Sequence, residues 1–392
     1  MPTTRIDLSS PEVLAEPYPY FAEERERHAI GWDERSSRWL TFDHPSASAV
    51  LRDRRLGRIW VDREPVERFE PFNLLHRNQM MENEPPDHTR LRRLVAGAFA
   101  RGHVERIRPR VREIARQLLD AVDVADFDVV REYAGPLPVL VISELLGVPP
   151  DLAPQLREWS QAIVRMYEVA PDDEVQDAAV GAARDFAELV RELARERTGT
   201  PTDDLISDLA AARVSTGSTT EARLSEDEVV ASAVLLLNAG HEASVNVFGN
   251  GLVAMLKRGI WPDDGEVETC VEEMLRFDSA LQLFERTATK DVRIGDVVVE
   301  KGQKVAALLG AANRDPEVFD RADEFDPARD PNPHLAFGAG LHFCLGAPLA
   351  RMELVESLTY LTRSIPTLRL VADPVSRATF VLRGYRSVRV GC

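Results

Sequence analysis

Lysine, cysteine and long apolar runs are all scarce in this chain of 392 residues. Only four of its 48 basic residues are lysines, and this preference for arginine is typical of a GC-rich bacterial genome. Residues 1–16 are polar and interrupted by proline, and we find no apolar run long enough for a signal peptide or a membrane span. These absences predict a soluble bacterial protein, and we expect it in the cytoplasm.

The three cysteines, Cys270, Cys344 and Cys392, form no disulfide framework, which fits a reducing compartment. Cys270 falls on an amphipathic helical pattern, so we expect it in the core. Cys392 is the last residue, and we expect it to be exposed. Cys344 differs from both because of the sequence that surrounds it.

A net charge of −17 argues against nucleic acid and anionic membranes as partners. The charge is uneven, however, because residues 90–116 hold nine arginines against two acids, Glu105 and Glu113. Two interpretations stay open for this arginine island. It is either a solvated helix face or a surface that steers an acidic partner.

Gly/Ser linkers, internal repeats and low-complexity tracts are also missing. Length alone would suggest two or three domains. With nothing in the sequence to divide the chain, we expect one domain over residues 1–392, mainly α-helical with small β-sheets.

A glycine-rich stretch surrounds Cys344 at residues 337–351. Gly338, Gly340 and Gly346 permit positive φ and close backbone approach, so this loop can curl tightly around the sulfur. A helical pattern follows the cysteine, and the N-terminus of a helix favours a negative charge. The residues therefore suit a single thiolate that binds haem iron, whereas the alternative is a buried cysteine in a turn.

The complete pattern F-G-x-G-x-H-x-C-x-G-x-x-L-A-R resembles the haem-binding loop of the cytochrome P-450 family, the haem-thiolate monooxygenases. The resemblance covers essentially the whole chain and implies the P-450 fold with its long central helix. It implies haem b with Cys344 as the axial ligand of the iron, and Phe337 packed against the sulfur.

The central helix is predicted by a capping box, Ser225 with Glu228, followed by a proline-free stretch over 226–257. Its middle carries Gly240 and Glu242 inside an apolar run, which is costly without a purpose. A close helix crossing at Gly240, with Glu242 paired to an arginine, is the structural alternative.

This segment resembles the oxygen-binding helix of the family, with the pattern A-G-x-[D/E]-T-[T/S]. Ala239, Gly240 and Glu242 match, but Ala243 stands where the family has threonine, and Ser244 lies about 100° further round the helix. The resemblance gives Glu242 a role in proton relay. Protons must then come through water, Ser244 or a hydroxyl of the substrate, and family members with alanine here often act on polar natural products or carry out other oxidations.

Several basic side chains are candidates for holding the haem propionates. His88 and Arg92 lie one helical turn apart, which places two cations on one face and suggests an anion between them, although a surface pair is the alternative. By resemblance, Arg286 and His342 complete the set. The cofactor-binding residues that we expect are His88, Arg92, Phe99, Ala239, Gly240, Arg286, Phe337, Gly338, His342, Cys344 and Gly346.

Glu273 and Arg276 are three residues apart on a helical pattern, a spacing usual for a surface pair. They match the buried E-x-x-R motif of the family, whose third partner would be Arg329. The resemblance implies that these three residues clamp the segment leading into the cysteine loop.

Other segments carry weaker signals. We expect a hairpin at residues 30–41, a helix at 45–52, a long loop at 60–81 and a surface loop at 199–223. The resemblance implies that the loop at 60–81 forms the roof of the substrate pocket, and that residues 159–166, with the polar turn at 171–173, form a lid over the substrate channel. Asn238 and Gln282 are polar at positions that are often apolar, which suggests a substrate with hydrogen-bonding groups. The pocket residues that we expect are Leu235, Asn238, Gln282, Leu283, Phe284 and Phe380.

The sequence is therefore identified as a member of the cytochrome P-450 family, which implies insertion of one oxygen atom from O₂ into a polar small-molecule natural product. Electrons would come from NAD(P)H through a ferredoxin and its reductase. The resemblance also implies that the enzyme is a monomer. Alternatives are oxidative coupling, ring formation or desaturation, including on a carrier-tethered substrate, and a haem-binding sensor without turnover.

Overall fold

The computed structural model describes residues 1–99, 103–168, 171–215 and 221–392. Residue contacts divide the chain into two compact units. The first unit holds residues 1–57, 115–135 and 243–392, and the second holds residues 58–114 and 136–242. None of the helices in the described ranges combines the length and apolarity that a bilayer crossing requires.

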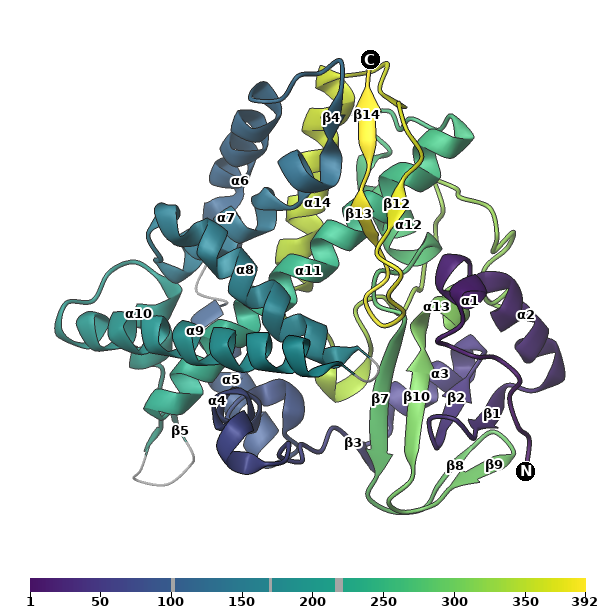
Figure 1. Ribbon diagram of the computed structural model, residues 1–392, viewed down its shortest axis with the longest axis horizontal. Helices are drawn as coiled ribbons and strands as arrows, with labels where there is room; N and C mark the ends of the chain where they lie inside the picture. The colour runs from purple at the N-terminus through teal and green to yellow at the C-terminus, as the bar shows by residue number, and fades with distance from the viewer. Residues whose placement is uncertain (100–102, 169–170, 216–220) are drawn as a thin grey trace. The chain divides into compact units, whose positions relative to one another are not determined.

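A five-stranded sheet forms the centre of the first unit, in the order β1-β2-β10-β7-β3. Its strands are β1 (Ile30–Asp33), β2 (Arg38–Thr41), β3 (Leu56–Gly57), β7 (Leu283–Ala288) and β10 (Lys304–Leu308) (Figure 1). The β1–β2 hairpin confirms the pairing expected for residues 30–41. Strand β10 runs parallel to β2 and antiparallel to β7.

Both faces of strand β10 are buried, because successive side chains of a strand point to opposite faces. Val305 and Ala307 belong to one apolar cluster, which includes Val50 of α3 (His44–Arg52). Ala306 and Leu308 belong to a second cluster, which includes Phe21 of α2 (Tyr18–Arg27). The sheet is therefore an internal layer of this unit.

The first unit also contains further helices, turns and small sheets outside this five-stranded sheet. They are α1 (Pro11–Ala15), α12 (Val267–Phe277), α13 (Leu309–Ala312), α14 (Ala347–Ser364), a π-helical turn η2 (Val129–Ala134), the 3₁₀ turn η5 (Gly340–His342), the sheet of β4 (Phe127–Asp128), β11 (Arg369–Leu370) and β14 (Arg389–Gly391), and the pairs β8 (Val292–Ile294) with β9 (Val297–Val299) and β12 (Val375–Ser376) with β13 (Tyr385–Ser387).

The second unit is mainly helical, and the long helix α9 (Asp173–Gly199) contacts α4 (Val66–Arg77), α8 (Ala153–Val164) and α10 (Leu205–Ala211) (Figure 1). Its other elements are α5 (Asp87–Phe99), α7 (Pro136–Leu146), the short pair β5 (Val214–Ser215) and β6 (Glu221–Ala222), and the 3₁₀ turns η1 (Met80–Glu82), η3 (Pro150–Leu152) and η4 (Arg165–Tyr167). Helix α6 (His103–Asp120) contributes residues to both units.

The long central helix is present as α11 (Glu226–Arg258), one residue longer than predicted. The capping box is confirmed, because the Glu228 amide donates to Ser225 Oγ at 3.2 Å and the Ser225 amide donates to Glu228 Oε2 at 2.8 Å. These two bonds satisfy N–H groups that the first turn of a helix would leave unpaired.

Two predicted loops are wrong in part. Residues 60–81 contain the helix α4, and residues 199–223 contain the helix α10, which Asp204 caps by accepting from the Ser207 amide. Helix α4 has no clean apolar period and contains Pro71, so its sequence resembles a loop. The local sequence does not favour a helix here, and contacts with α9, including the Arg68–Asp177 ion pair at 2.7 Å, stabilise the helical conformation of α4.

Candidate active site

The loop that carries Cys344 is fixed by its own backbone. The Cys344 amide donates to the Phe337 carbonyl at 3.0 Å, and the Gly338 amide donates to the Leu335 carbonyl at 2.8 Å. Gly338 and Gly340 have φ of 68° and 70°, in the left-handed region that favours glycine. A Cβ at Gly340 would also lie 2.5 Å from the Leu51 carbonyl oxygen, so only glycine lets this loop approach α3.

Cys344 is partly exposed, and helix α14 begins three residues after it. Gly346 is the N-cap of this helix, and a Cβ placed there would lie 4.0 Å from Cys344 Sγ. A helix N-terminus stabilises a nearby thiolate. This partly exposed sulfur beside a helix N-terminus fits a thiolate ligand of haem iron.

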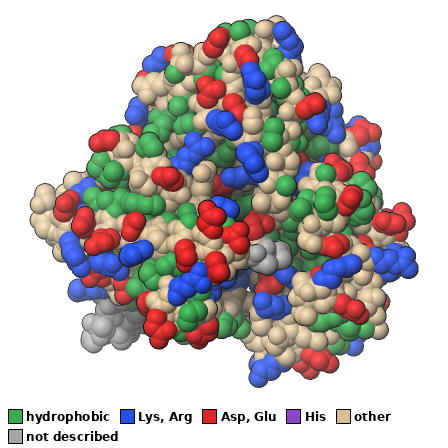
Figure 2. Space-filling view, in the orientation of Figure 1, with side chains coloured by type: hydrophobic (Ala, Val, Ile, Leu, Met, Phe, Trp, Pro, Cys, Tyr) green, Lys and Arg blue, Asp and Glu red, His purple; other side chains and the backbone are tan. Residues whose placement is uncertain are grey.

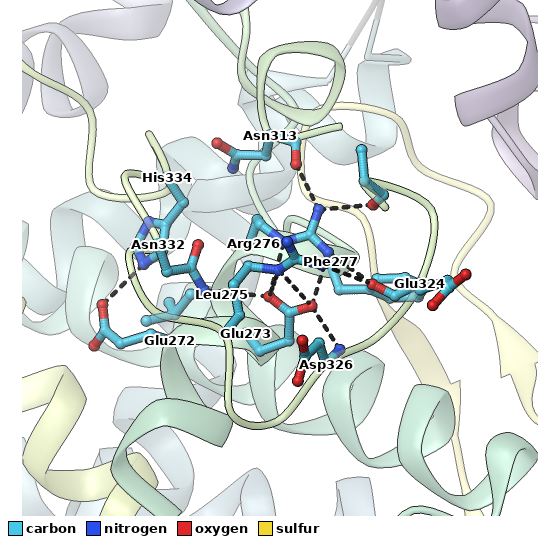
Figure 3. Close-up of polar contacts among 12 residues, drawn as sticks. Glu272, Glu273, Leu275, Arg276, Phe277, Asn313, Glu324, Asp326, Asn332 and His334 are labelled. Atoms are coloured by element: carbon cyan, nitrogen blue, oxygen red, sulfur yellow. Dashed lines mark hydrogen bonds and ion pairs between the residues drawn. The ribbon is translucent and has the colours of Figure 1, made fainter. Parts of the chain in front are cut away.

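A buried ion network supports the segment that leads into this loop (Figure 3). Arg276 and Glu273 are fully buried, and their side chains are joined by two hydrogen bonds of 2.7 and 2.8 Å. Arg329 Nε donates to the same carboxylate at 3.1 Å. The predicted clamp of Glu273, Arg276 and Arg329 is therefore confirmed.

Backbone groups complete this network, as buried charges require. Arg276 Nη1 donates to the carbonyls of Asn313 and Ala322, both at 2.8 Å, and the Asp326 amide donates to Glu273 Oε1 at 2.9 Å. The Asn313 side chain accepts from the Leu335 amide at 2.7 Å, which carries the connection to the start of the cysteine loop.

A second group of contacts, centred on Glu272, was not predicted from the sequence. Glu272 accepts from Arg351 at 2.6 and 2.8 Å and lies 2.9 Å from His334 Nε2 (Figure 3 draws Glu272 and His334). Burial raises the pKa of Glu272, but its bonds to Arg351 and His334 outweigh burial and lower this pKa to about 2. The Arg351 guanidinium also lies 4.5 Å from the ring centroid of Phe337. Of these residues, the sequence analysis had singled out Phe337 and Arg351, the arginine of the L-A-R pattern, but not their contacts with Glu272 and His334.

Strand β7 brings further predicted residues to the first unit. Arg286 is buried, donates to the Glu285 carbonyl and lies over the ring of Phe284 at 5.6 Å. A Cβ at Gly338 would lie 3.5 Å from this ring, so the strand and the cysteine loop are in contact. His342 lies in η5 and is partly exposed.

The other expected pocket residues of this unit are enclosed. Gln282 is fully buried, and its amide donates to the Ser279 carbonyl at 2.7 Å. Leu283 and Phe380 belong to the apolar cluster on one face of the sheet, where Phe380 meets Phe21 edge to face.

The other two cysteines lie as predicted, with Cys270 buried and Cys392 exposed.

The second unit holds the other expected haem residues. His88 is 1% exposed and Arg92 is partly exposed on α5. Phe99 is the last residue of α5, and its side chain lies outside the described part of the structure.

Helix α11 has one accessible face near its middle. Ala239 is exposed, and Gly240 and Ala243 are partly exposed, while residues 229–238 are largely buried. A Cβ placed on Gly240 would meet no atom within 4 Å outside its own helix, so no close helix crossing explains this glycine. The accessible small residues fit a helix face that lies against a flat group. Glu242 is buried, 3.7 Å from His241 Nδ1, and Ser244 is also buried.

A small cavity of about 10 Å³ lies within the second unit. Leu235 and Asn238, both predicted pocket residues, line it from α11. The remaining lining residues, which the sequence did not indicate individually, are Leu75, His76, Gln79, Ile163, Tyr167, Ala231 and Val234.

The arginine island is balanced by acids from other elements. Arg90 pairs with Glu228 of α11, Arg110 with Glu144 of α7 at 2.7 Å, and Arg106 with Asp203 at 3.3 Å. Figure 2 likewise shows acidic and basic side chains interspersed on the face that it draws. The local charge is therefore less positive than residues 90–116 alone suggest.

A mainly helical fold with a glycine-rich cysteine loop before a helix, anchored by a buried Glu–Arg–Arg network, defines the haem-thiolate oxygenases. The family model for cytochrome P450 matches residues 267–364, which contain this network and the loop. The chain belongs to the cytochrome P450 family.

Relatives of known activity extend the match over nearly the whole chain. Nocardicin C N-oxygenase of Nocardia uniformis is 39% identical over 346 residues, which cover 86% of this chain and 84% of that protein. The 6-deoxyerythronolide B hydroxylase of Saccharopolyspora erythraea is 36% identical over 406 residues, or 97% of each chain. The crystal structure of P450BioI with an acyl carrier protein ligated to hexadec-9Z-enoic acid has a TM-score of 0.90 and 31% identity, covering 98% of this chain and all of that one.

These relationships show the general activity. The protein is a cytochrome P450 monooxygenase that uses haem with a cysteine thiolate ligand, O₂ and electrons derived from NAD(P)H.

Proposed function

We propose that this enzyme inserts one oxygen atom from O₂ into a polar small-molecule natural product, with Cys344 as the thiolate ligand. The observation that carries the assignment of Cys344 is its place at the N-terminus of α14, in a loop tied to the buried Glu273–Arg276–Arg329 network. The relatives named for nocardicin C and 6-deoxyerythronolide B support a natural product as substrate.

Haem supplies the activation of O₂ when it is bound, and the side chains of this protein bind and orient it. We assign the propionates to His88, Arg92, Arg286 and His342. Phe337 and Gly338 would line the sulfur side, with Gly346 leaving room beside the sulfur. Ala239 and Gly240 would offer the accessible face of α11, and Phe99 is a further proposed cofactor-binding residue.

Proton delivery follows from the residues on α11. Glu242 is buried next to His241, and this carboxyl would pass protons towards the active site. Ala243 has no hydroxyl to hold a water or a proton at its position. Ser244 or a hydroxyl of the substrate would take over that part of the relay.

Electrons would come from NAD(P)H through a ferredoxin reductase and a ferredoxin. Residues 1–392 would act as one haem-thiolate domain, in the cytoplasm and as a monomer. The Phe343 side chain lies next to Cys344 and is 42% exposed, which suits contact with the ferredoxin.

A carrier-tethered substrate is the second candidate, with oxidative coupling, ring formation or desaturation as the reaction. Ala243 favours it, because by resemblance family members with alanine at this position often carry out oxidations other than simple hydroxylation. The structural similarity to P450BioI, whose crystal structure holds an acyl carrier protein with a bound fatty acid, also supports it.

The test is product formation by the purified holoenzyme with NADPH, a surrogate ferredoxin and its reductase, in ¹⁸O₂. We expect a product that carries one labelled oxygen atom from a free natural product. A product without label would favour coupling or desaturation. Turnover only of substrates attached to a carrier protein would favour the second candidate.

A further inference from the structure

A positive charge lies beside the loop that carries Cys344. Arg351 is on the second turn of α14, and helical side chains lean towards the N-terminus of their helix, here the end next to Cys344. Its guanidinium lies 4.5 Å from the ring centroid of Phe337, whose carbonyl oxygen accepts from the Cys344 amide at 3.0 Å. The bonds to Glu272 raise the pKa of Arg351 against the effect of burial, and the charges of Glu272 and Cys344 raise it further. The guanidinium and the sulfur therefore interact electrostatically.

Glu272 supplies the opposite charge. Its carboxylate accepts from Nε and Nη2 of Arg351 at 2.6 and 2.8 Å. Despite burial, the bonds to Arg351 and His334 lower the pKa of Glu272 to about 2, so it is ionised at pH 7. The two-point bond keeps both charges in one place, and their effects on the Cys344 sulfur largely cancel.

His334 adds a hydrogen bond to this pair without adding a charge. The Ala336 amide donates to His334 Nδ1 at 3.3 Å, so this nitrogen carries no proton and the ring proton is on Nε2. Nε2 lies 2.9 Å from Glu272 Oε2 and donates to it. The histidine therefore orients the carboxylate, and the net charge of the three side chains is zero.

We propose that Glu272 is a positioning residue that sets the reduction potential of the haem through Arg351. It holds the guanidinium over Phe337 and balances its charge, so that the Cys344 thiolate keeps its electron donation to the iron. An unbalanced guanidinium would favour the reduced haem, because reduction adds a negative charge near it. This inference rests on the proposed function, in which Cys344 is the ligand.

The test is the ratio of ferrous to ferric haem in substrate-free holoenzyme, poised at the midpoint potential of the native protein and read from the absorption spectrum. Glu272→Gln leaves the charge of Arg351 unbalanced, and this ratio should rise roughly twofold to tenfold, the size expected for one solvent-screened charge. Arg351→Gln leaves the charge of Glu272 unbalanced, and the ratio should fall by a similar factor. The double variant should return the ratio close to one.

Opposite shifts are the signature of charge, because a loop that is merely loosened would move both single variants in the same direction. Arg351→Lys and Glu272→Asp keep the charges while weakening the two-point bond, so both should stay close to the native ratio. The matched control is Arg363→Gln, which removes an exposed ion pair with Asp264, 2.9 Å long, from the last turn of α14. It should leave the ratio at one.

Three results would overturn the inference. They are shifts of the same sign in Glu272→Gln and Arg351→Gln, no shift in either, and a double variant that does not return towards the native ratio. The ratio is measured on the fraction whose reduced carbon monoxide complex has a thiolate spectrum, so a modest loss of stability does not affect it. A native protein without that spectrum would refute the proposed ligand itself, which distinguishes the two failures.

Discussion

Arg351 and Glu272 form a two-point ion pair, with Nε and Nη2 of the guanidinium 2.6 and 2.8 Å from the two carboxylate oxygens. The pair joins α12 to α14, the helix that follows Cys344. Its guanidinium also covers the ring of Phe337. Arg351 therefore connects α12, the helix that carries the buried ion network, with the residues before and after Cys344.

Replacing Glu272 should weaken this loop. Glu272→Gln removes the charge that Arg351 and His334 bind, at a cost of roughly 1–3 kcal/mol in the free energy of unfolding. Unfolding by urea at pH 7 measures the loss. Glu268→Gln, an exposed glutamate on the same helix, is the matched control and should change little.

The pH dependence of Glu272 has a defined sign. Its pKa is about 2 in the folded protein against a reference value of 4.5, so its stabilising effect is complete above pH 4.5 and is lost as the pH falls towards 2. The difference in stability between the native protein and Glu272→Gln should shrink across that interval. A difference that is constant from pH 5 to pH 3 would contradict the ion pair.

Replacing Arg276 should reduce the yield of folded protein and its haem content more than replacing an exposed arginine. Arg276→Met leaves the Glu273 carboxylate buried with one partner fewer, and such losses cost about 3–5 kcal/mol. We expect little folded protein and a low haem-to-protein ratio, with Arg276→Lys intermediate because it cannot form the two-point pair. Arg293→Lys, an exposed position, should retain the native haem content.

His76 should make the native protein sensitive to mild acid. Its folded pKa of about 4 is below the reference value of 6.5, so the unfolded state takes up a proton first as the pH falls. Stability should be constant above pH 6.5 and fall by on the order of 3 kcal/mol by pH 4. His76→Phe should remove this slope, whereas Tyr167→Phe, which keeps the imidazole, should retain it. Urea midpoints between pH 7 and pH 4 measure both slopes, and equal slopes in the two variants would contradict the assignment.

In the proposed proton relay, we predict that Ala243 limits how protons are supplied during turnover. Ala243 is partly exposed on α11, so threonine fits there. We expect Ala243→Thr to raise the product formed per NADPH consumed, most strongly with substrate analogues that lack the hydroxyl group. The ratio of product to NADPH is the measurement, and an unchanged ratio would contradict a substrate that supplies the missing group.

The sequence predicted those features that depend on local patterns. The capping box at Ser225 placed α11 to within one residue. The spacing of Glu273 and Arg276 alone fits a surface pair, and the resemblance to the family motif predicted the buried clamp. It did not predict α4, whose Pro71 and mixed pattern are overcome by packing on α9. It also missed Glu272 with Arg351, because the two lie far apart in the chain and each resembles a surface charge.

In the proposed function, Cys344 supplies the thiolate that binds the haem iron. The most direct measurement is the absorption spectrum of the reduced carbon monoxide complex of the native protein, Cys344→His and Cys392→Ser. We predict the red-shifted Soret band of a thiolate ligand for the native protein and Cys392→Ser, and a band at the shorter wavelength of histidine-ligated haem for Cys344→His. A thiolate spectrum that persists in Cys344→His would show that Cys344 is not the ligand.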